Sequence, residues 1–189
     1  DPSPEKVRKG SSSAIIAGIA DYLNKNGYAS GGFCAYTTSD VMTGSGLSSS
    51  AAFEVMVGNL LNYFYNDGTV NNVEIAKIAQ YSENVHFGKP CGLMSQLTIA
   101  LGHTVYADFT SHEIQPIEAN FVSMGLALCL TDTGGSHAGL DSSYARIPAD
   151  MVYIANLFDK GVLADVDPEA FRAKGWDASN RPVRRAMHF

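Results

Sequence analysis

The chain has 189 residues, of which 46% are hydrophobic, 10% aromatic and 17% charged, so it is long and apolar enough to fold around a core of its own. Its 13 Lys and Arg against 19 Asp and Glu give a net charge of −6, with no basic run of the kind that neutralises phosphate backbones. We therefore expect a globular protein that binds no nucleic acid.

The sequence does not predict a membrane protein or a disulfide-linked one. The longest apolar stretch, residues 124–130, is far shorter than the roughly 20 residues that a spanning helix needs, and the first residues lack the apolar core of a signal peptide. The three cysteines, Cys34, Cys91 and Cys129, are an odd number without C-x-x-C spacing. We expect a cytoplasmic protein with reduced thiols.

The first half of the chain predicts helices separated by glycine-rich loops. Residues 13–26 place apolar side chains at helical spacing ahead of Gly27. Residues 33–39, aromatic and β-branched in part, predict a short strand that leads into a Gly and Ser loop. Ser49 or Ser50 is the expected N-cap of a second helix, which has a broad apolar stripe.

Two more helices and a strand are expected before residue 110. Asn71, with Glu74 three residues later, resembles a capping box and starts a helix that runs toward His86. A short helix is expected over 92–101 and a strand over 104–109.

The remaining sequence changes character. Residues 126–130 are apolar without alternation, which predicts a fully buried strand. The polar stretch before them contains Pro116, so we place a domain junction near residue 118. Pro148 is suited to the first turn of a helix that Gly161 closes.

The strongest local signal is the segment from Gly44 to Ala52, which is GSGLSSSAA. Glycines let backbone amides approach a ligand, hydroxyls can donate to phosphate oxygens or hold a cation, and the start of a helix adds positive potential. The alternative is a flexible loop with an ordinary serine N-cap. Ala51 and Ala52 favour the phosphate loop because small residues permit close packing behind it. The segment lacks the lysine of a Walker motif and is not a dinucleotide fingerprint.

Two segments carry a resemblance to the GHMP kinases, the superfamily of galactokinase, homoserine kinase and mevalonate kinase. GSGLSSSAA resembles their second motif, G-x-G-L-(S/G)-S-S-A. The segment AQYSENVHFGKPCGLMSQ, residues 79–96, resembles the galactokinase pattern A-x-x-x-E-x-x-x-x-G-x-x-C-G-I-M-D-Q. The residues in register are Glu83, Gly88, Cys91, Gly92, Met94 and Gln96. A looser match to a third galactokinase segment runs through Thr133, Leu140, Ser143, Tyr144 and Arg146.

The resemblance implies an α/β fold of two layers (α+β), of the GHMP kinase or ribosomal protein S5 domain 2-like type. Residues 1–118 would be part of the N-terminal nucleotide-binding domain and residues 119–189 the start of the C-terminal domain. The implied reaction is ATP-dependent phosphorylation of galactose, or a similar small sugar, at C1, with magnesium bridging the phosphates. ATP and Mg²⁺ are thus the expected cofactors.

The resemblance also implies the site residues. Glu83 is the expected magnesium ligand, with the Ser50 hydroxyl completing the shell, although a helical glutamate taken alone is more often a solvated charge. Gly92 and Tyr144 match positions that touch the sugar, although a tyrosine also serves to pack its ring. Asp132 and Thr133 end the expected buried strand and are weaker candidates. The ATP phosphates are expected at Gly44, Ser45, Gly46, Leu47, Ser48, Ser49, Ser50 and Ala51.

Ser95 departs from the galactokinase pattern at its catalytic position. The family has an aspartate there, which orients or deprotonates the sugar C1 hydroxyl. A serine hydroxyl is no base near pH 7, and the loss of a positioned base costs roughly 10²- to 10⁴-fold in rate. An engineered inactive variant, a natural pseudokinase and a divergent kinase with another base all explain the change. A sensor that binds sugar and ATP and signals to a protein partner is the alternative function.

Two further galactokinase signatures have no counterpart in the chain. One is the N-terminal G-R-x-x-x-x-G-x-H-x-D element, which supplies an arginine and sugar contacts, and the other is the C-terminal G-x-G-F-G-G element. Residues 183–189 also end inside a helical pattern. We therefore expect this chain to be a central fragment without turnover of its own, and an inactive structural fragment is a third interpretation.

Overall fold

Apolar side chains at helical spacing fold the first half of the chain into helices that share one core. The computed structural model describes residues 3–41, 44–111, 113–132, 134, 139–177 and 179–188. By their contacts, Asp1–Ala138 and Gly139–Phe189 are separate compact units, each described here by itself. The expected boundary near residue 118 between the two family domains stays a prediction.

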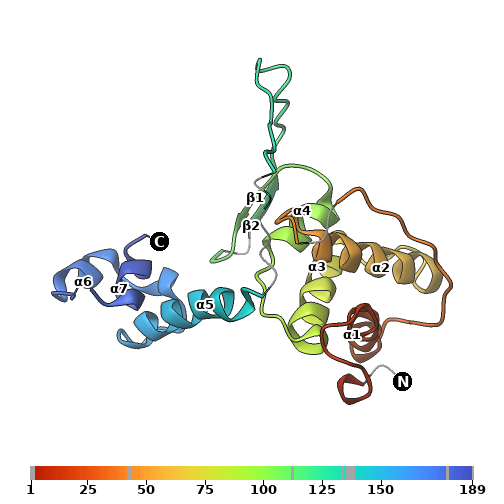
Figure 1. Ribbon diagram of the computed structural model, residues 1–189, viewed down its shortest axis with the longest axis horizontal. Coiled ribbons are helices and arrows are strands. Elements are labelled where there is room, and N and C mark those ends of the chain that lie inside the picture. The colour runs from red at the N-terminus through yellow and green to blue at the C-terminus, as the bar shows by residue number, and fades with distance from the viewer. Residues whose placement is uncertain are drawn as a thin grey trace. The chain divides into compact units, whose positions relative to one another are not determined.

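Figure 1 labels the α-helices and the two strands. Among the described residues, none of the helices is long and apolar enough to cross a membrane. The elements are η1 (Pro4–Lys6), α1 (Ser12–Lys25), α2 (Ser49–Tyr65), α3 (Asn72–Tyr81), η2 (Ser82–Phe87), α4 (Met94–Leu101), β1 (Val105–Asp108), β2 (Glu113–Pro116), α5 (Asp141–Asn156), η3 (Leu163–Asp165), α6 (Pro168–Ala173) and α7 (Arg181–Ala186).

The core of the first unit lies between α1, α2 and α3. Helix α3 packs against α1, α2 and α4, so its apolar stripe is covered on several sides. Burial of these side chains supplies most of the stability of the unit. The buried set is Ile15, Ile19, Leu23, Val55, Val57, Leu61, Val70, Ile75, Ile78 and Ala79.

Side-chain caps start two of these helices. The Ser11 hydroxyl accepts the Ala14 N–H at 3.2 Å at the start of α1. The Asn71 side-chain oxygen Oδ1 accepts the Glu74 N–H at 2.9 Å at the start of α3, so the expected cap at Asn71 is confirmed. The helices expected over 13–26 and 92–101 are confirmed within a few residues.

A small antiparallel sheet follows α4. Strand β1 pairs with β2 in the register Val105 opposite Pro116 and Asp108 opposite Glu113. The strand expected over 104–109 is confirmed. Its partner β2 was not expected, because it is short, polar and ends in proline. Such a sequence does form an edge strand, where proline costs no ladder hydrogen bond.

Two expected strands are wrong. Residues 33–39 and 126–130 form no strand. Leu126, Leu128 and Leu130 are 54%, 78% and 72% exposed, not buried. A β-prone segment becomes a strand only when a neighbouring strand takes up its backbone hydrogen bonds, and none pairs with these segments in the part of the chain that the structure describes. Asp132 therefore does not stand at the end of a buried strand.

Pro148 lies inside α5 and not in its first turn, and α5 ends at Asn156 well before Gly161. The helix extends on both sides of the proline because its C-terminal half is held by packing. Ile154 is buried with Val183 of α7 in the core of the second unit. Tertiary packing thus outweighs the local cost of an interior proline.

Asn62 on α2 closes the turn that follows this helix. The buried Asn62 amide donates to the Val70 carbonyl at 2.9 Å and accepts the Val70 N–H at 3.0 Å. One side chain therefore satisfies both backbone groups of a buried residue.

We predict that Asn62→Leu lowers the free energy of unfolding by about 2 kcal/mol or more, because both Val70 backbone groups lose their partners in a buried place. Asn59 lies on the exposed side of the same helix, so Asn59→Leu is the matched control and should stay within about 0.5 kcal/mol. Urea unfolding of both variants measures the difference. Equal losses in the two variants would contradict this role.

Candidate active site

The glycine-rich segment forms a tight loop directly before α2. Gly44 and Gly46 have φ of 78° and 79°, and the N-cap Ser48 has φ 58°, a left-handed conformation that is rare for a residue with a side chain. Residues 42 and 43 lie outside the described residues. The expected loop before a helix is confirmed, and the strand expected to lead into it is absent.

The first turn of α2 supplies backbone N–H groups that the helix does not use. The first intrahelical bond runs from the Ala52 N–H to the Ser48 carbonyl at 3.0 Å. The amides of Ser49, Ser50 and Ala51 precede it and have no partner within the helix. The first turn of α2 carries no acidic residue that would reduce the positive potential of the helix N-terminus.

Ser95 on α4 meets this loop. Its hydroxyl oxygen lies 2.8 Å from the Ser48 hydroxyl oxygen, a hydrogen bond between residues far apart in the sequence. Leu97 faces the core and is 1% exposed, whereas Ser95 lies on another face of α4 and is half-buried, as the spacing predicts. The position at which the galactokinase pattern has aspartate is thus in contact with the glycine-rich loop.

Two buried carboxyl groups lie behind the loop, joined by one amide. The Gln96 side-chain N–H₂ donates to Glu54 at 3.1 Å and to Glu83 at 3.1 Å. Glu54, Glu83 and Gln96 are 0%, 2% and 2% exposed. The alternative of Glu83 as a solvated charge is therefore wrong. The Lys89 ammonium lies 3.6 Å from Glu83, so this carboxylate has a cationic partner.

The surroundings of Glu54 change its pKa. Burial, and then the charge of Glu83, raise the pKa of Glu54 to about 8. Among the described residues, Glu54 Oε1 and Gln96 Oε1 have no hydrogen-bond partner. Burial also raises the pKa of the Cys91 thiol, with the Glu83 carboxylate adding to the effect, so Cys91 is not an activated nucleophile.

The donor set fits a hard cation that also binds phosphate. Ser50 and Glu54 are four residues apart on α2 and share a face, so the Ser50 hydroxyl lies one turn from the carboxyl pair on the side of the loop. Hydroxyl and carboxylate oxygens suit Mg²⁺. The described residues hold no cluster of three or more His, Cys, Asp or Glu for a metal, so phosphate and water would have to complete the coordination.

The segment with the expected sugar contact Gly92 is held by Asn84. The Asn84 side chain accepts the Cys91 N–H at 2.7 Å and donates to the Cys91 carbonyl at 3.3 Å. Gly92 is exposed, and a side chain there would meet nothing within 4 Å, so the position opens onto free space.

The other expected ligand residues are Tyr144, Asp132 and Thr133. Tyr144 is on α5 in the second unit. Asp132 is exposed and accepts the Gly134 N–H at 2.8 Å in a local turn. Thr133 lies outside the described residues. The sequence reasoning missed Glu54, although a charged residue inside the broad apolar stripe of α2 was a signal that could have found it.

Comparison with known proteins identifies the family. Residues 14–103 match the family described as GHMP kinases N terminal domain, and this range contains both the loop and the carboxyl pair. Residues 14–103 belong to the GHMP kinases.

Within this family the chain resembles the galactokinases. It is 36% identical over 182 residues to a galactokinase of Clostridium tetani, covering 90% of this chain and 45% of that protein. It is 36% identical over 157 residues to a galactokinase of Actinobacillus pleuropneumoniae, covering 80% and 40%.

The fold matches that of a solved galactokinase. The crystal structure of Lactococcus lactis galactokinase complexed with galactose superimposes with a TM-score of 0.74 at 21% identity, covering 98% of this chain and 49% of that chain. The expected GHMP kinase fold is confirmed. The chain spans about half the length of the relatives that it matches.

The raised pKa of Glu54 predicts a pH-dependent stability. The unfolded chain releases this proton near pH 4.5 and the native protein near pH 8, so between these values the native state holds more protons and the free energy of unfolding falls as the pH rises. Glu54→Gln removes the titrating carboxyl group and keeps an acceptor for the Gln96 amide. Its stability relative to the parent should increase from pH 5 to pH 9 by about 1.4 kcal/mol per unit of pKa shift.

Denaturant unfolding at several pH values measures this difference. Glu118 is exposed, so Glu118→Gln should parallel the parent across the range. A constant difference between Glu54→Gln and the parent would mean that Glu54 titrates as an ordinary glutamate.

Proposed function

We propose that the protein to which this sequence belongs is a sugar kinase that transfers the γ-phosphate of ATP to the C1 hydroxyl of galactose. The observation that carries the proposal is the contact between Ser95 and Ser48. It joins the segment that resembles the sugar-phosphorylating site of galactokinases to the loop that resembles their ATP phosphate site. Similarity to galactokinases over most of the chain supports the choice of sugar.

Each part of the site has a separate task in this proposal. The amides and hydroxyls of the loop, from Gly44 to Ala51, bind the ATP phosphates at the start of α2. Ser50 and Glu83 hold Mg²⁺, which neutralises charge on the phosphates when it is bound. Gly92 and Tyr144 contact the sugar. Phosphoryl transfer depends mainly on such positioning and charge stabilisation.

Ser95 supports a second candidate function. Its neutral hydroxyl donates or accepts a hydrogen bond but does not remove a proton from the sugar near pH 7. A protein with this site binds ATP and sugar and turns them over slowly. Such a protein suits a sensor that reports both ligands to a protein partner, and retained binding with little turnover distinguishes the sensor from the kinase.

The change Ser95→Asp tests the role of this position. In a full-length protein that carries this sequence, the new carboxylate should raise kcat for galactose by at least roughly 10²-fold, with a much smaller change in KM, because a base acts mainly in the transition state. Ser95→Asn has nearly the same shape without the charge and is the matched control. Steady-state kinetics that give equal kcat values for the two variants would refute this assignment.

The phosphate loop is tested by binding alone. We expect Ser50→Ala to weaken the binding of Mg·ATP about tenfold, because it removes a hydroxyl from a charged ligand. Ser13 occupies the same position in the first turn of α1 as Ser50 in α2, so Ser13→Ala is the control and should bind like the parent. Isothermal titration calorimetry measures both, and equal affinities would place the nucleotide elsewhere.

A further inference from the structure

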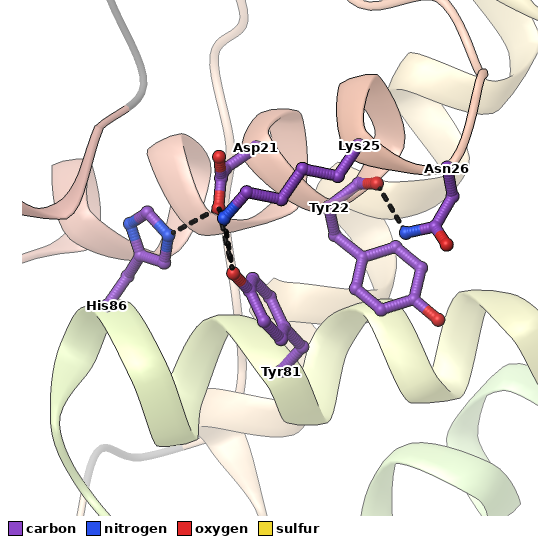
Figure 2. Close-up of polar contacts among 6 residues, drawn as sticks. All are labelled: Asp21, Tyr22, Lys25, Asn26, Tyr81 and His86. Atoms are coloured by element: carbon purple, nitrogen blue, oxygen red, sulfur yellow. Dashed lines mark hydrogen bonds and ion pairs between the residues drawn. The ribbon is translucent and has the colours of Figure 1, made fainter.

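A second polar network joins α1 to the turn that carries Glu83. Figure 2 shows the His86 imidazole and the Tyr81 phenol directed from the α3–η2 helix toward Asp21 on α1, with the Lys25 side chain lying across them. One oxygen, Asp21 Oδ2, is 2.8 Å from Lys25 Nζ, 2.8 Å from the Tyr81 hydroxyl and 3.1 Å from His86 Nε2. Nothing in the proposed reaction uses these groups.

The contacts of Asp21 differ in their surroundings. His86 is 0% exposed, whereas the Lys25 side chain is 60% exposed. Burial acts to raise the pKa of Asp21, but hydrogen bonds from Lys25, Tyr81 and His86 outweigh it and hold the pKa below its ordinary value. Asp21 is therefore a carboxylate, and the His86 ring donates to it from Nε2.

Close packing between α1 and η2 adds to the contacts of Asp21. A Cβ added at Gly18 of α1 would lie 2.8 Å from Ser82 Cα and 3.0 Å from His86 Cβ, which is too close for a side chain. Helix α1 therefore lies directly on the backbone of η2. The Gly10 N–H adds a bond to the Phe87 carbonyl at 3.1 Å, at the other end of η2.

The segment η2 is π-helical, so the directions of its side chains differ from those in a regular α-helix. A π-turn places one more residue in a turn than an α-helix does, so it changes by about 100° the direction in which the residues after it point. Glu83 and Asn84 both lie in this π-helical turn. Glu83 accepts a hydrogen bond from the Gln96 amide, and Asn84 accepts one from the Cys91 N–H. The Glu83 carbonyl also accepts the N–H groups of Gly88 and Lys89, at 2.9 Å and 3.1 Å.

We propose that Asp21, through its hydrogen bond to the buried His86 and the close approach at Gly18, is a positioning residue that sets the rotation of the π-helical turn Ser82–Phe87. The two faces of this turn have separate partners: His86 binds α1, while Glu83 and Asn84 hold the Gln96 amide and the Cys91 backbone. The inference rests on the proposed function, in which Glu83 holds the metal and the segment after Cys91 contacts the sugar.

Hydrogen exchange tests the positioning without any ligand. The amides of Gly88, Lys89 and Cys91 are bonded to Glu83 and Asn84 and report on this turn. We expect His86→Leu, which keeps a similar volume without a donor, to speed their exchange by at least about tenfold, while the Val70 amide changes by less than about twofold. His86→Gln keeps a donor near the Nε2 position and should retain parental exchange.

Lys25→Leu is the matched control, because Lys25 donates to the same Asp21 oxygen at 2.8 Å but from the exposed side. It should leave the exchange of the three amides unchanged. Asp21→Leu, which is of similar size and has no acceptor for His86, is the second variant if His86→Leu folds poorly, and it should also speed exchange of those amides. Equal effects of His86→Leu and Lys25→Leu, or equal acceleration at Val70, would overturn the proposal.

Binding of Mg·ATP to the same variants tests the consequence for the site. We expect His86→Leu to weaken Mg·ATP at least about fivefold and metal-free ATP much less, because the metal ligand moves. Faster exchange with unchanged Mg·ATP affinity would show that the turn is held for stability alone, and it would overturn the positioning role. If the parent itself binds no Mg·ATP, the proposed function fails, while the exchange measurement still decides whether Asp21 and His86 hold the turn.

Discussion

The hydrogen bonds of the Gln96 amide are the constraint on which the site depends. One N–H₂ group reaches carboxyls of α2 and η2 from α4, so three helical elements are fixed at one point inside the first unit. Two carboxyls so close together and so little exposed do not both ionise at low cost. Burial and the neighbouring Glu83 therefore raise the pKa of Glu54 to about 8, whereas Glu83 has the Lys89 ammonium 3.6 Å away.

The start of α2 and the Glu54–Glu83 pair give the site a defined polarity. The helix start at Ser49 and its unused N–H groups present positive potential, and the carboxylate lies behind it. Such an arrangement suits an anionic phosphate at the start of the helix and a cation between the phosphate and Glu83. This is the electrostatic basis on which a nucleotide and Mg²⁺ bind together in the proposed reaction.

The turn that bears Glu83 is held from two sides. On one side it contacts α1 through Asp21 and Gly18, and on the other it contacts Gln96 and the backbone of Cys91. A π-helical turn is rare and less regular than an α-helical one, so contacts on both sides help to fix its conformation. Its rotation therefore depends on residues of α1 that no local motif would single out.

The sequence by itself determined the helices of the first unit, the family resemblance and the presence of a loop before α2. Helices α1, α2 and α3 followed from apolar spacing, and the Asn71 cap from the residue types at the helix start, because both depend on contacts within a few residues. Only the tertiary structure decided which β-prone segments are strands, since pairing needs a distant partner, and so 126–130 was wrongly expected to be buried. It alone decided that Ser95 meets Ser48 and that Glu54 is a buried acid, because both depend on how α2, η2 and α4 pack together.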